Sequence, residues 1–152
     1  MKEEHFSGLN KINQKQKNQM KGTYTLLIKV PKNIEVRIGK LGKINFKKGF
    51  YAYVGSALNG LEKRIERHLR KEKKLRWHID YLLENAEIAE VIYAETDSRT
   101  ECNIAGKLNE NLESVKKFGC SDCKCKSHLF YHTNFSELNN MISEAFKKNK
   151  LQ

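Results

Sequence analysis

One segment, GTYTLLIKV at Gly22–Val30, does most to limit the folds open to this chain. Its β-branched and aromatic residues favour a strand, and three apolar residues follow one another from Leu26 to Ile28. Because successive residues of a strand point to opposite faces of a sheet, such a run suits a central strand that is buried on both faces. The sequence therefore predicts a sheet built around this segment.

Further strands are expected on both sides of this segment in the sheet. Residues 33–55 alternate apolar and polar side chains around three glycines, which is typical of one or two hairpin strands, and the last of them closes at Tyr53 and Val54. The segment EIAEVIYAET, residues 87–96, has strand composition, and a short strand is expected at residues 128–132 after a loop.

Apolar residues at three- and four-residue intervals predict helices between and after these strands. Asn59 is the candidate N-cap of the first helix and Ser136 that of the last. Glu101 should lie in the first turn of the third helix, where the helix dipole favours a negative charge. The four helices are expected at residues 61–69, at residues 75–86, from about residue 100, and at residues 135–149.

The order of these elements predicts an α/β protein with a small, mainly antiparallel sheet flanked by three or four helices. Residues 22–150 suit a single domain that ends in a Cys/His segment and a helix. Residues 1–21 are polar and basic, so we expect a flexible tail there. No apolar run approaches the roughly 20 residues that cross a bilayer, and residues 1–21 contain no signal-peptide core, which predicts a cytoplasmic protein.

Positive charge is in large excess, with 29 Lys and Arg against 18 Asp and Glu and a net charge of +11. Such an excess favours an anionic partner, a nucleic acid or a charged membrane surface. Residues 60–76 hold eight basic and three acidic side chains, and cations along a polynucleotide release counterions, which gives affinity without reading sequence. The pattern also fits a solvated helix face with internal ion pairs. The candidate nucleic-acid-binding residues are Lys63, Arg67, Arg70, Lys71 and Lys74.

A cluster of candidate phosphate-binding groups surrounds the turn GSALNG, residues 55–60. Arg64 and His68 are four residues apart in the following helix, so they share a face, and a guanidinium offers two parallel donors to a phosphate. Tyr24 and Tyr53 lie on strands that should be neighbours, and hydroxyls beside cations can position or deprotonate water. Each group taken alone also fits simple packing or solvation, but together they indicate a phosphate site.

The order of these parts resembles the GIY-YIG nuclease family. GTY at residues 22–24 and YVG at residues 53–55 are followed by Arg64, His68 and an acidic residue that opens a later helix. The similarity covers about residues 22–108. Within the family the chain looks most like an uncharacterised, largely archaeal branch, sometimes attached to endonuclease III-type repair proteins, whose members carry segments like WHIDYLL and GCSDCxCxSHL.

The resemblance implies a metal-dependent endonuclease that hydrolyses phosphodiester bonds of nucleic acid, with DNA as the expected substrate and repair as the expected setting. Tyr24 would activate or position the attacking water, with Tyr53 beside it in the same hydrogen-bonded group. Arg64 would neutralise charge on the scissile phosphate, and His68 would support the nucleophile or the phosphate. Glu101 matches the single carboxylate that holds one divalent ion, Mg²⁺ or Mn²⁺.

Several points stay open at this stage. Glu95 and Asp97 are alternative metal ligands if the third helix begins elsewhere. His78 and Asp80 are further candidates for the site, although the aromatic residues around them favour a packed helix.

The two tyrosines are separated by more residues than in most family members, so residues 31–49 are expected to form an inserted hairpin, and the tyrosines meet only if the flanking strands stay paired. This insertion favours a second hypothesis, a module with a nuclease-like fold that binds nucleic acid without cutting it. A third, a cysteine-based redox or metal-handling protein, rests only on residues 120–128.

The segment CSDCKCKSH holds four soft or borderline donors, Cys120, Cys123, Cys125 and His128, enough for a tetrahedral Zn²⁺ with a structural role. The C-x-C step would crowd a metal ion, so Cys102 can replace one ligand. Buried thiols, a disulfide and a reactive cysteine pair are the alternatives.

Overall fold

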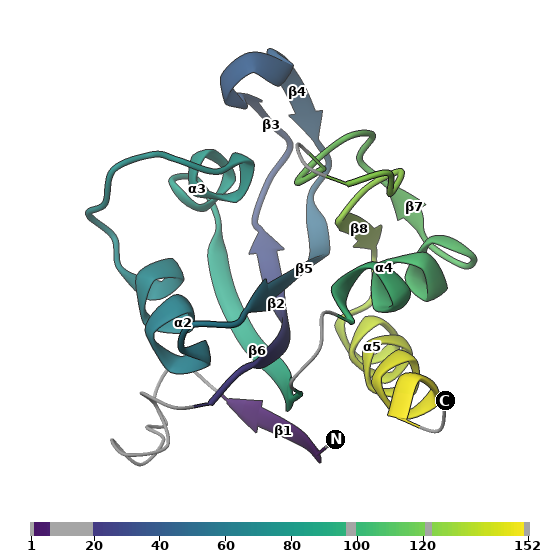
Figure 1. Ribbon diagram of the computed structural model, residues 1–152. Coiled ribbons are helices and arrows are strands. Elements are labelled where there is room, and N and C mark those ends of the chain that lie inside the picture. Colours follow the sequence, from purple (N-terminus) through teal and green to yellow (C-terminus); the bar gives the residue numbers. More distant parts are fainter. Residues whose placement is uncertain (1, 7–19, 97–99, 121–122, 151–152) are drawn as a thin grey trace.

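A six-stranded sheet runs through the centre of the computed structural model, which describes residues 2–6, 20–96, 100–120 and 123–150 (Figure 1). Every pair of neighbouring strands is antiparallel, so the predicted fold class is confirmed. In spatial order the strands are β1 (Lys2–Phe6), β6 (Glu87–Glu95), β2 (Gly22–Val30), β5 (Gly49–Ala57), β8 (Leu129–His132) and β7 (Glu113–Ser114).

Strand β2 is the central, doubly buried strand that its composition predicts, since all of its residues except Lys29 are buried. Its alternate side chains enter two different cores: Leu26 and Ile28 belong to one, and Leu27 to the other. Consecutive apolar residues are needed here because each face of the strand is covered.

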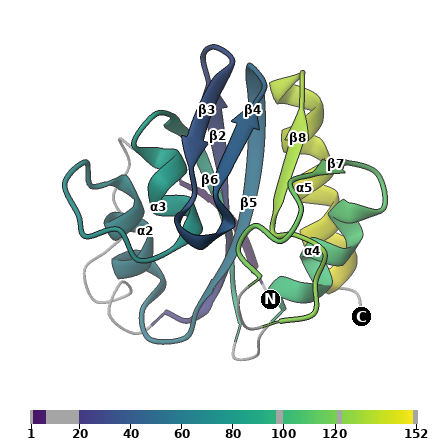
Figure 2. The ribbon, with the colours of Figure 1, turned by 90° about the horizontal axis from the view of Figure 1, so that it is seen from above.

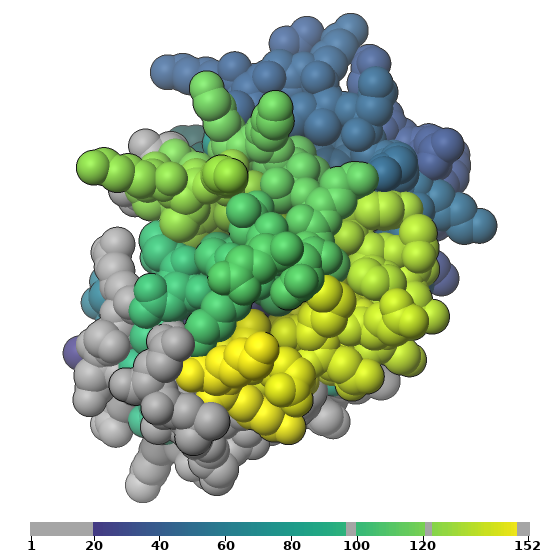
Figure 3. All heavy atoms as spheres, turned by 90° about the vertical axis from the view of Figure 1, so that its right-hand side faces the viewer, coloured from purple at the N-terminus to yellow at the C-terminus, as the bar shows by residue number. Residues whose placement is uncertain are grey.

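Helices cover both faces of the sheet, as Figures 1 and 2 show. On one face α2 (Leu61–Leu69) and α3 (His78–Leu83) pack against the first core through Ile65 and Ile79. On the other, α4 (Glu101–Asn109) and α5 (Phe135–Lys150) pack against the second core and lie side by side in Figure 3. The result is a three-layer arrangement with two hydrophobic cores.

The predicted inserted hairpin is confirmed. Strands β3 (Ile34–Arg37) and β4 (Lys43–Phe46), joined through the short 3₁₀ helix η1 (Gly39–Leu41), form a separate two-stranded sheet that stands at the top of Figure 1. Beneath it β2 and β5 stay paired from Gly22 opposite Ala57 to Val30 opposite Gly49. The insertion therefore leaves the strands that carry the two tyrosines in register.

Both predicted helix caps are wrong. The N-cap of α2 is Gly60 rather than Asn59, and it makes no side-chain capping bond. Helix α5 begins at Phe135, and the Oδ1 atom of Asn134 accepts a hydrogen bond from the backbone N–H of Glu137 at 2.9 Å. Asn134 thus does what was expected of the serine two positions later, Ser136, because an N-cap oxygen must reach the N–H three residues ahead.

Strand β1 differs from the flexible tail expected over residues 1–21. It pairs with β6 from Lys2 opposite Glu95 to Phe6 opposite Val91. An edge strand is held by backbone hydrogen bonds, which need no apolar sequence, so composition alone did not reveal it. Residues 7–19 of the expected tail lie outside the described residues. Among the residues described, no helix is long and apolar enough to cross a membrane.

Candidate active site

A cavity of about 580 Å³ opens where the end of β5, α2, the start of α3 and the start of α4 meet. Four of the five residues assigned to catalysis by resemblance line it: Tyr24, Tyr53, Arg64 and Glu101. The fifth, His68, is buried behind Tyr24 on α2. Residues that are far apart in the sequence therefore face one shared space.

The pairing of β2 with β5 brings the two tyrosines together. Tyr24 is opposite Gly55 and Tyr53 is opposite Leu26, so the tyrosines are diagonal neighbours on one face. A Cβ atom on Gly55 would lie 2.5 Å from both Cζ and Oη of Tyr24. Glycine at the end of the YVG triplet thus lets the Tyr24 ring lie across the neighbouring strand.

His68 is held close to the hydroxyl of Tyr24. Its Nε2 atom lies 2.7 Å from Tyr24 Oη, and only 2% of the residue is exposed. Burial, reinforced by the charge of Lys73, lowers the pKa of His68 to about 3, so the imidazole is neutral at physiological pH. Burial likewise raises the pKa of Tyr24, although Arg64 opposes that shift, and the phenol remains protonated.

The hydrogen bond has a preferred direction. Nδ1 of His68 is buried without a hydrogen-bond partner. A buried N–H without an acceptor costs more than an unused lone pair, so we place the single proton of the ring on Nε2, which donates to Tyr24 Oη. The Tyr24 hydroxyl then keeps its own proton and one lone pair for groups in the cavity.

The neutral state of His68 makes the stability of the fold depend on pH. Because its folded-state pKa lies below the unfolded value near 6.5, its contribution is complete above pH 6.5 and is lost as pH falls toward 3. Between pH 7 and pH 5 we expect the free energy of unfolding to fall by about 2 kcal/mol more in the wild type than in His68→Gln. Urea unfolding at both pH values measures this difference, and parallel losses would contradict a buried neutral imidazole.

Arg64 is oriented at the cavity wall by two contacts. Its NH1 donates to the Ser56 carbonyl at 3.1 Å, and its guanidinium lies 4.6 Å from the centre of the Trp77 ring. A guanidinium carries five N–H donors, and the Ser56 carbonyl accepts from one of them, so further donors are available to an anion. The sequence predicted only a packing role for Trp77. Its position directly after the basic segment, residues 60–76, was the one feature that could have indicated a contact with these arginines.

Arg67 has a structural role that was not foreseen. Its NH1 and NH2 atoms donate to the two carboxylate oxygens of Asp80 at 2.9 and 3.0 Å, and Asp80 is fully buried. The guanidinium also stacks on Trp77, 4.2 Å from the ring centre, so Arg64 and Arg67 both contact the same indole. Arg67 was predicted to contact nucleic acid, whereas here it supports the wall that carries Arg64.

Asp80 explains why α3 starts later than its sequence pattern suggests. Its Oδ2 accepts hydrogen bonds from the backbone N–H groups of Arg76 at 2.9 Å and Trp77 at 3.0 Å, which leaves His78 as the first helical residue. Burial by itself would raise the pKa of Asp80, but the hydrogen bonds from Arg67 and the two N–H groups outweigh it and lower the pKa. Asp80 does not line the 580 Å³ cavity and is a structural anion.

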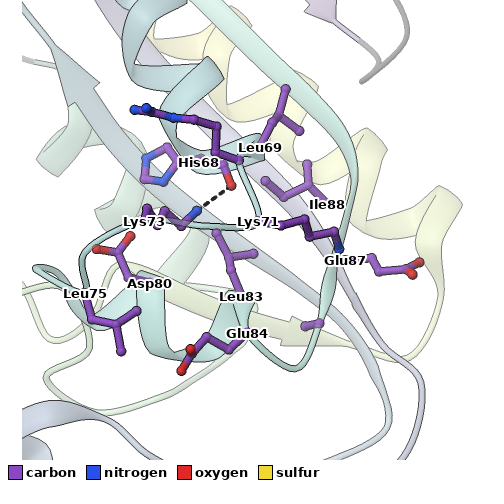
Figure 4. Close-up of a pocket in the computed structure, with 12 residues that line it drawn as sticks. His68, Leu69, Lys71, Lys73, Leu75, Asp80, Leu83, Glu84, Glu87 and Ile88 are labelled. Carbon is purple, nitrogen blue, oxygen red and sulfur yellow. Dashed lines mark hydrogen bonds between the residues drawn. The ribbon is translucent and has the colours of Figure 1, made fainter.

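The remaining predicted nucleic-acid contacts are exposed: Lys63, Arg70, Lys71 and Lys74. A second cavity, of about 250 Å³, lies between the end of α2, α3 and β6 (Figure 4). In it the Lys73 ammonium donates to the carbonyls of Arg67 at 3.1 Å and His68 at 2.7 Å. The ammonium group therefore donates hydrogen bonds to carbonyls at the C-terminal end of α2, where a positive charge also interacts favourably with the helix dipole.

Glu101 supplies the only carboxylate among the described residues that line the larger cavity. Its helix starts beside Thr100, whose hydroxyl lies 2.7 Å from that of Thr23 on β2. The alternative ligand Glu95 is exposed on β6 and does not line the cavity, and Asp97 lies outside the described residues. His78 does line it, and its Nδ1 accepts a hydrogen bond from the Gly119 N–H at 2.8 Å.

A separate cluster of metal-ligating side chains adjoins this cavity. The donor atoms of Cys102, Cys123, Cys125 and His128 all lie within 4.8 Å of one another, and the cluster can hold a metal ion. Cys120 was expected as a ligand but lies outside the cluster, and its Sγ contacts the Phe118 carbonyl at 3.5 Å. Cys102 takes the fourth place because α4 brings it to the loop. All four cysteines are free thiols, not disulfides.

Comparison with known proteins assigns the chain to a family. Residues 23–151 match the family described as "Domain of unknown function DUF123". No curated protein and no solved structure matches the chain. The match includes every residue that lines the larger cavity and all four members of the Cys/His cluster. The chain therefore belongs to the DUF123 family.

Proposed function

We propose that this protein is a metal-dependent endonuclease that hydrolyses phosphodiester bonds of nucleic acid, with DNA as the expected substrate, in the manner of the GIY-YIG nucleases that its sequence resembles. The observation that carries the proposal is the convergence of Tyr24, Tyr53, Arg64 and Glu101 from β2, β5, α2 and α4 on one cavity. A purely structural cluster has no need of a carboxylate and a stacked guanidinium around an open space.

The chemistry of phosphodiester hydrolysis matches these groups. The reaction needs a positioned water, cationic groups for the non-bridging oxygens and a stabiliser for the leaving oxygen. Arg64 binds the phosphate, and Tyr24 positions the attacking water. Since ionisation is unfavourable for both Tyr24 and His68, the pair works by hydrogen bonding rather than by carrying charge.

The donor set at Glu101 fits a hard divalent cation. A carboxylate with hydroxyl groups nearby suits Mg²⁺ or Mn²⁺, which keeps several of its waters. When bound, such an ion supplies Lewis-acid stabilisation of charge on the phosphate oxygens. The Cys/His cluster is of the opposite type, because its thiolates and imidazole favour Zn²⁺.

A second candidate function is binding of nucleic acid without cleavage. It is favoured by the inserted hairpin, whose exposed side chains are mostly basic and include Lys40 at the rim of the cavity. The two functions separate in one experiment, in which a panel of DNA and RNA substrates is incubated with Mg²⁺ or Mn²⁺ and both binding and cleavage are recorded. If the protein binds a nucleic acid of the panel but yields no cleavage products, the second candidate function is selected.

Loss of the Arg64 side chain provides the sharper test. We expect Arg64→Ala to cut the cleavage rate by about 10²- to 10³-fold, because a preorganised cation is removed from the phosphate. Lys63→Ala is the matched control, since it removes the same charge from the neighbouring, exposed position of α2 and should cost less than about threefold. Equal effects of both substitutions, or full activity in Arg64→Ala, would refute the assignment.

A further inference from the structure

We propose that Cys102, Cys123, Cys125 and His128 bind one Zn²⁺ ion, and that this ion fixes the position of Glu101 in the cavity. The metal site stands independently of the nuclease proposal. Only the consequence for cleavage rests on that proposed function.

The donor atoms are already close to the spacing of a zinc site. Tetrahedral Zn²⁺ with bonds of about 2.3 Å to sulfur places its sulfur ligands about 3.8 Å apart. The four donors here lie within 4.8 Å of one another, and Cys123 Sγ is 3.3 Å from His128 Nε2. Small rotations of the cysteine side chains are enough to close the site around one ion.

The histidine is prepared for a metal by its second nitrogen. His128 is buried, and its Nδ1 lies 3.1 Å from the Val54 carbonyl oxygen. A carbonyl can only accept, so Nδ1 carries the proton and donates it, and Nε2 presents its lone pair toward Cys123. Metal-binding histidines almost always donate their other N–H to a carbonyl or carboxylate in this way. This contact is evidence for a ligand that chance proximity of thiols would not provide.

Backbone hydrogen bonds hold the same histidine in place. The N–H of His128 donates to the Phe118 carbonyl at 2.9 Å, and its carbonyl accepts from the Val54 N–H at 2.9 Å. One ligand is therefore held against β5 beside Val54, and the others come to it from α4 and the loop.

The cluster joins three parts of the cavity wall. Cys102 follows Glu101 directly in the first turn of α4. Gly119 begins the loop with a φ of +75°, lines the cavity, and approaches so closely that a Cβ there would lie 3.2 Å from the Tyr53 ring. His128 is anchored to Val54, the residue after Tyr53. An ion shared by these segments ties the carboxylate, the loop and the tyrosine strand together.

The first turn of α4 lacks the side-chain cap that would hold it in place. Its N-cap residue, Thr100, makes no side-chain capping bond, and the hydroxyl of Thr100 instead pairs with Thr23. Helix ends without caps fray readily, so the direction of Glu101 depends on what holds the first turn. A bond from Cys102 to a metal would supply that restraint.

Metal content is the first test. The full chain, purified without chelators, should contain about one zinc per molecule by elemental analysis, and Co²⁺ replacement should give the visible absorption of tetrahedral thiolate coordination. Cys123→Ser and Cys102→Ser should lose the ion, whereas Cys120→Ser, the matched control outside the cluster, should keep it. Absence of zinc from the wild type, loss in Cys120→Ser, or a disulfide among the cluster thiols by mass spectrometry would overturn the site.

Hydrogen–deuterium exchange tests the link to Glu101 without any substrate. Removal of zinc, by chelation of the wild type or in Cys102→Ser, should speed exchange of the peptide covering residues 100–108 by at least about tenfold and leave β2 protected. Protection of β2 also reports that the variant is folded. Unchanged exchange in α4 after loss of the ion would overturn the positioning role. Zinc-bound protein with a protected α4 that never cuts nucleic acid contradicts only the proposed function.

Discussion

Replacement of Glu101 with Gln is expected to lower Mg²⁺-dependent cleavage by about 10³-fold or more. Glutamine keeps the size of the side chain but has no charge to hold a hydrated cation. Glu101 is the only carboxylate among the described residues lining the cavity, so no neighbour there can replace it. Single-turnover rates at saturating Mg²⁺, measured on the best substrate of the panel, give the size of the effect.

Glu95→Gln is the control for this substitution. Glu95 is an exposed carboxylate at the end of β6, and its replacement changes the net charge by the same amount. We expect it to retain most of the activity, and we expect Glu101→Gln to retain its zinc. Comparable losses in both variants, or activity of Glu101→Gln near that of the wild type, would show that the cation is held elsewhere.

Asp80→Ala is expected to lower the free energy of unfolding at pH 7 by about 3–5 kcal/mol, a large part of the stability of a small domain. The buried carboxylate accepts four hydrogen bonds, two from Arg67 and one each from the backbone of Arg76 and Trp77. Its removal leaves a largely buried guanidinium without its counter-ion and two N–H groups without acceptors. Urea unfolding followed by circular dichroism measures the loss.

The charge of Asp80 gives this prediction a pH dependence. Its folded pKa is lowered, so its contribution is complete above the unfolded value near 3.9 and is lost as pH falls through the folded value. The difference between wild type and Asp80→Ala should therefore narrow below about pH 4. Glu84→Ala, at an exposed carboxylate just after α3, should cost less than about 0.5 kcal/mol and serves as the control. If Asp80→Ala lowered the free energy of unfolding by no more than the Glu84→Ala control, the ion pair of Asp80 with Arg67 would not be needed for stability.

Trp77 connects the Asp80 ion pair to Arg64 in the cavity. Because Arg64 and Arg67 both stack on this indole, release of Arg67 from Asp80 should also loosen the wall against which Arg64 is stacked. A folded Asp80 variant with reduced cleavage would follow from that arrangement, even though Asp80 does not line the cavity.

Local sequence was sufficient where a single segment encodes both an element and its environment. The apolar run of β2 predicts a strand buried on both faces, and the alternation around the glycines predicts hairpin strands. The spacing of Leu61, Ile65 and Leu69 predicts α2 and places Arg64 near the turn. The resemblance then named five residues, four of which line one cavity.

Partner choice, in contrast, was decided by tertiary structure. Arg67 looks like any solvent-facing cation until α3 brings Asp80 to it, and Cys120 looks like a better ligand than Cys102 until α4 meets the loop. The polar segment at residues 2–6 becomes a strand only because β6 offers an unpaired edge. The physical reason is that periodicity specifies which face of an element is buried, whereas an ion pair, a metal ligand set or an edge pairing depends on which groups packing brings within a few ångströms.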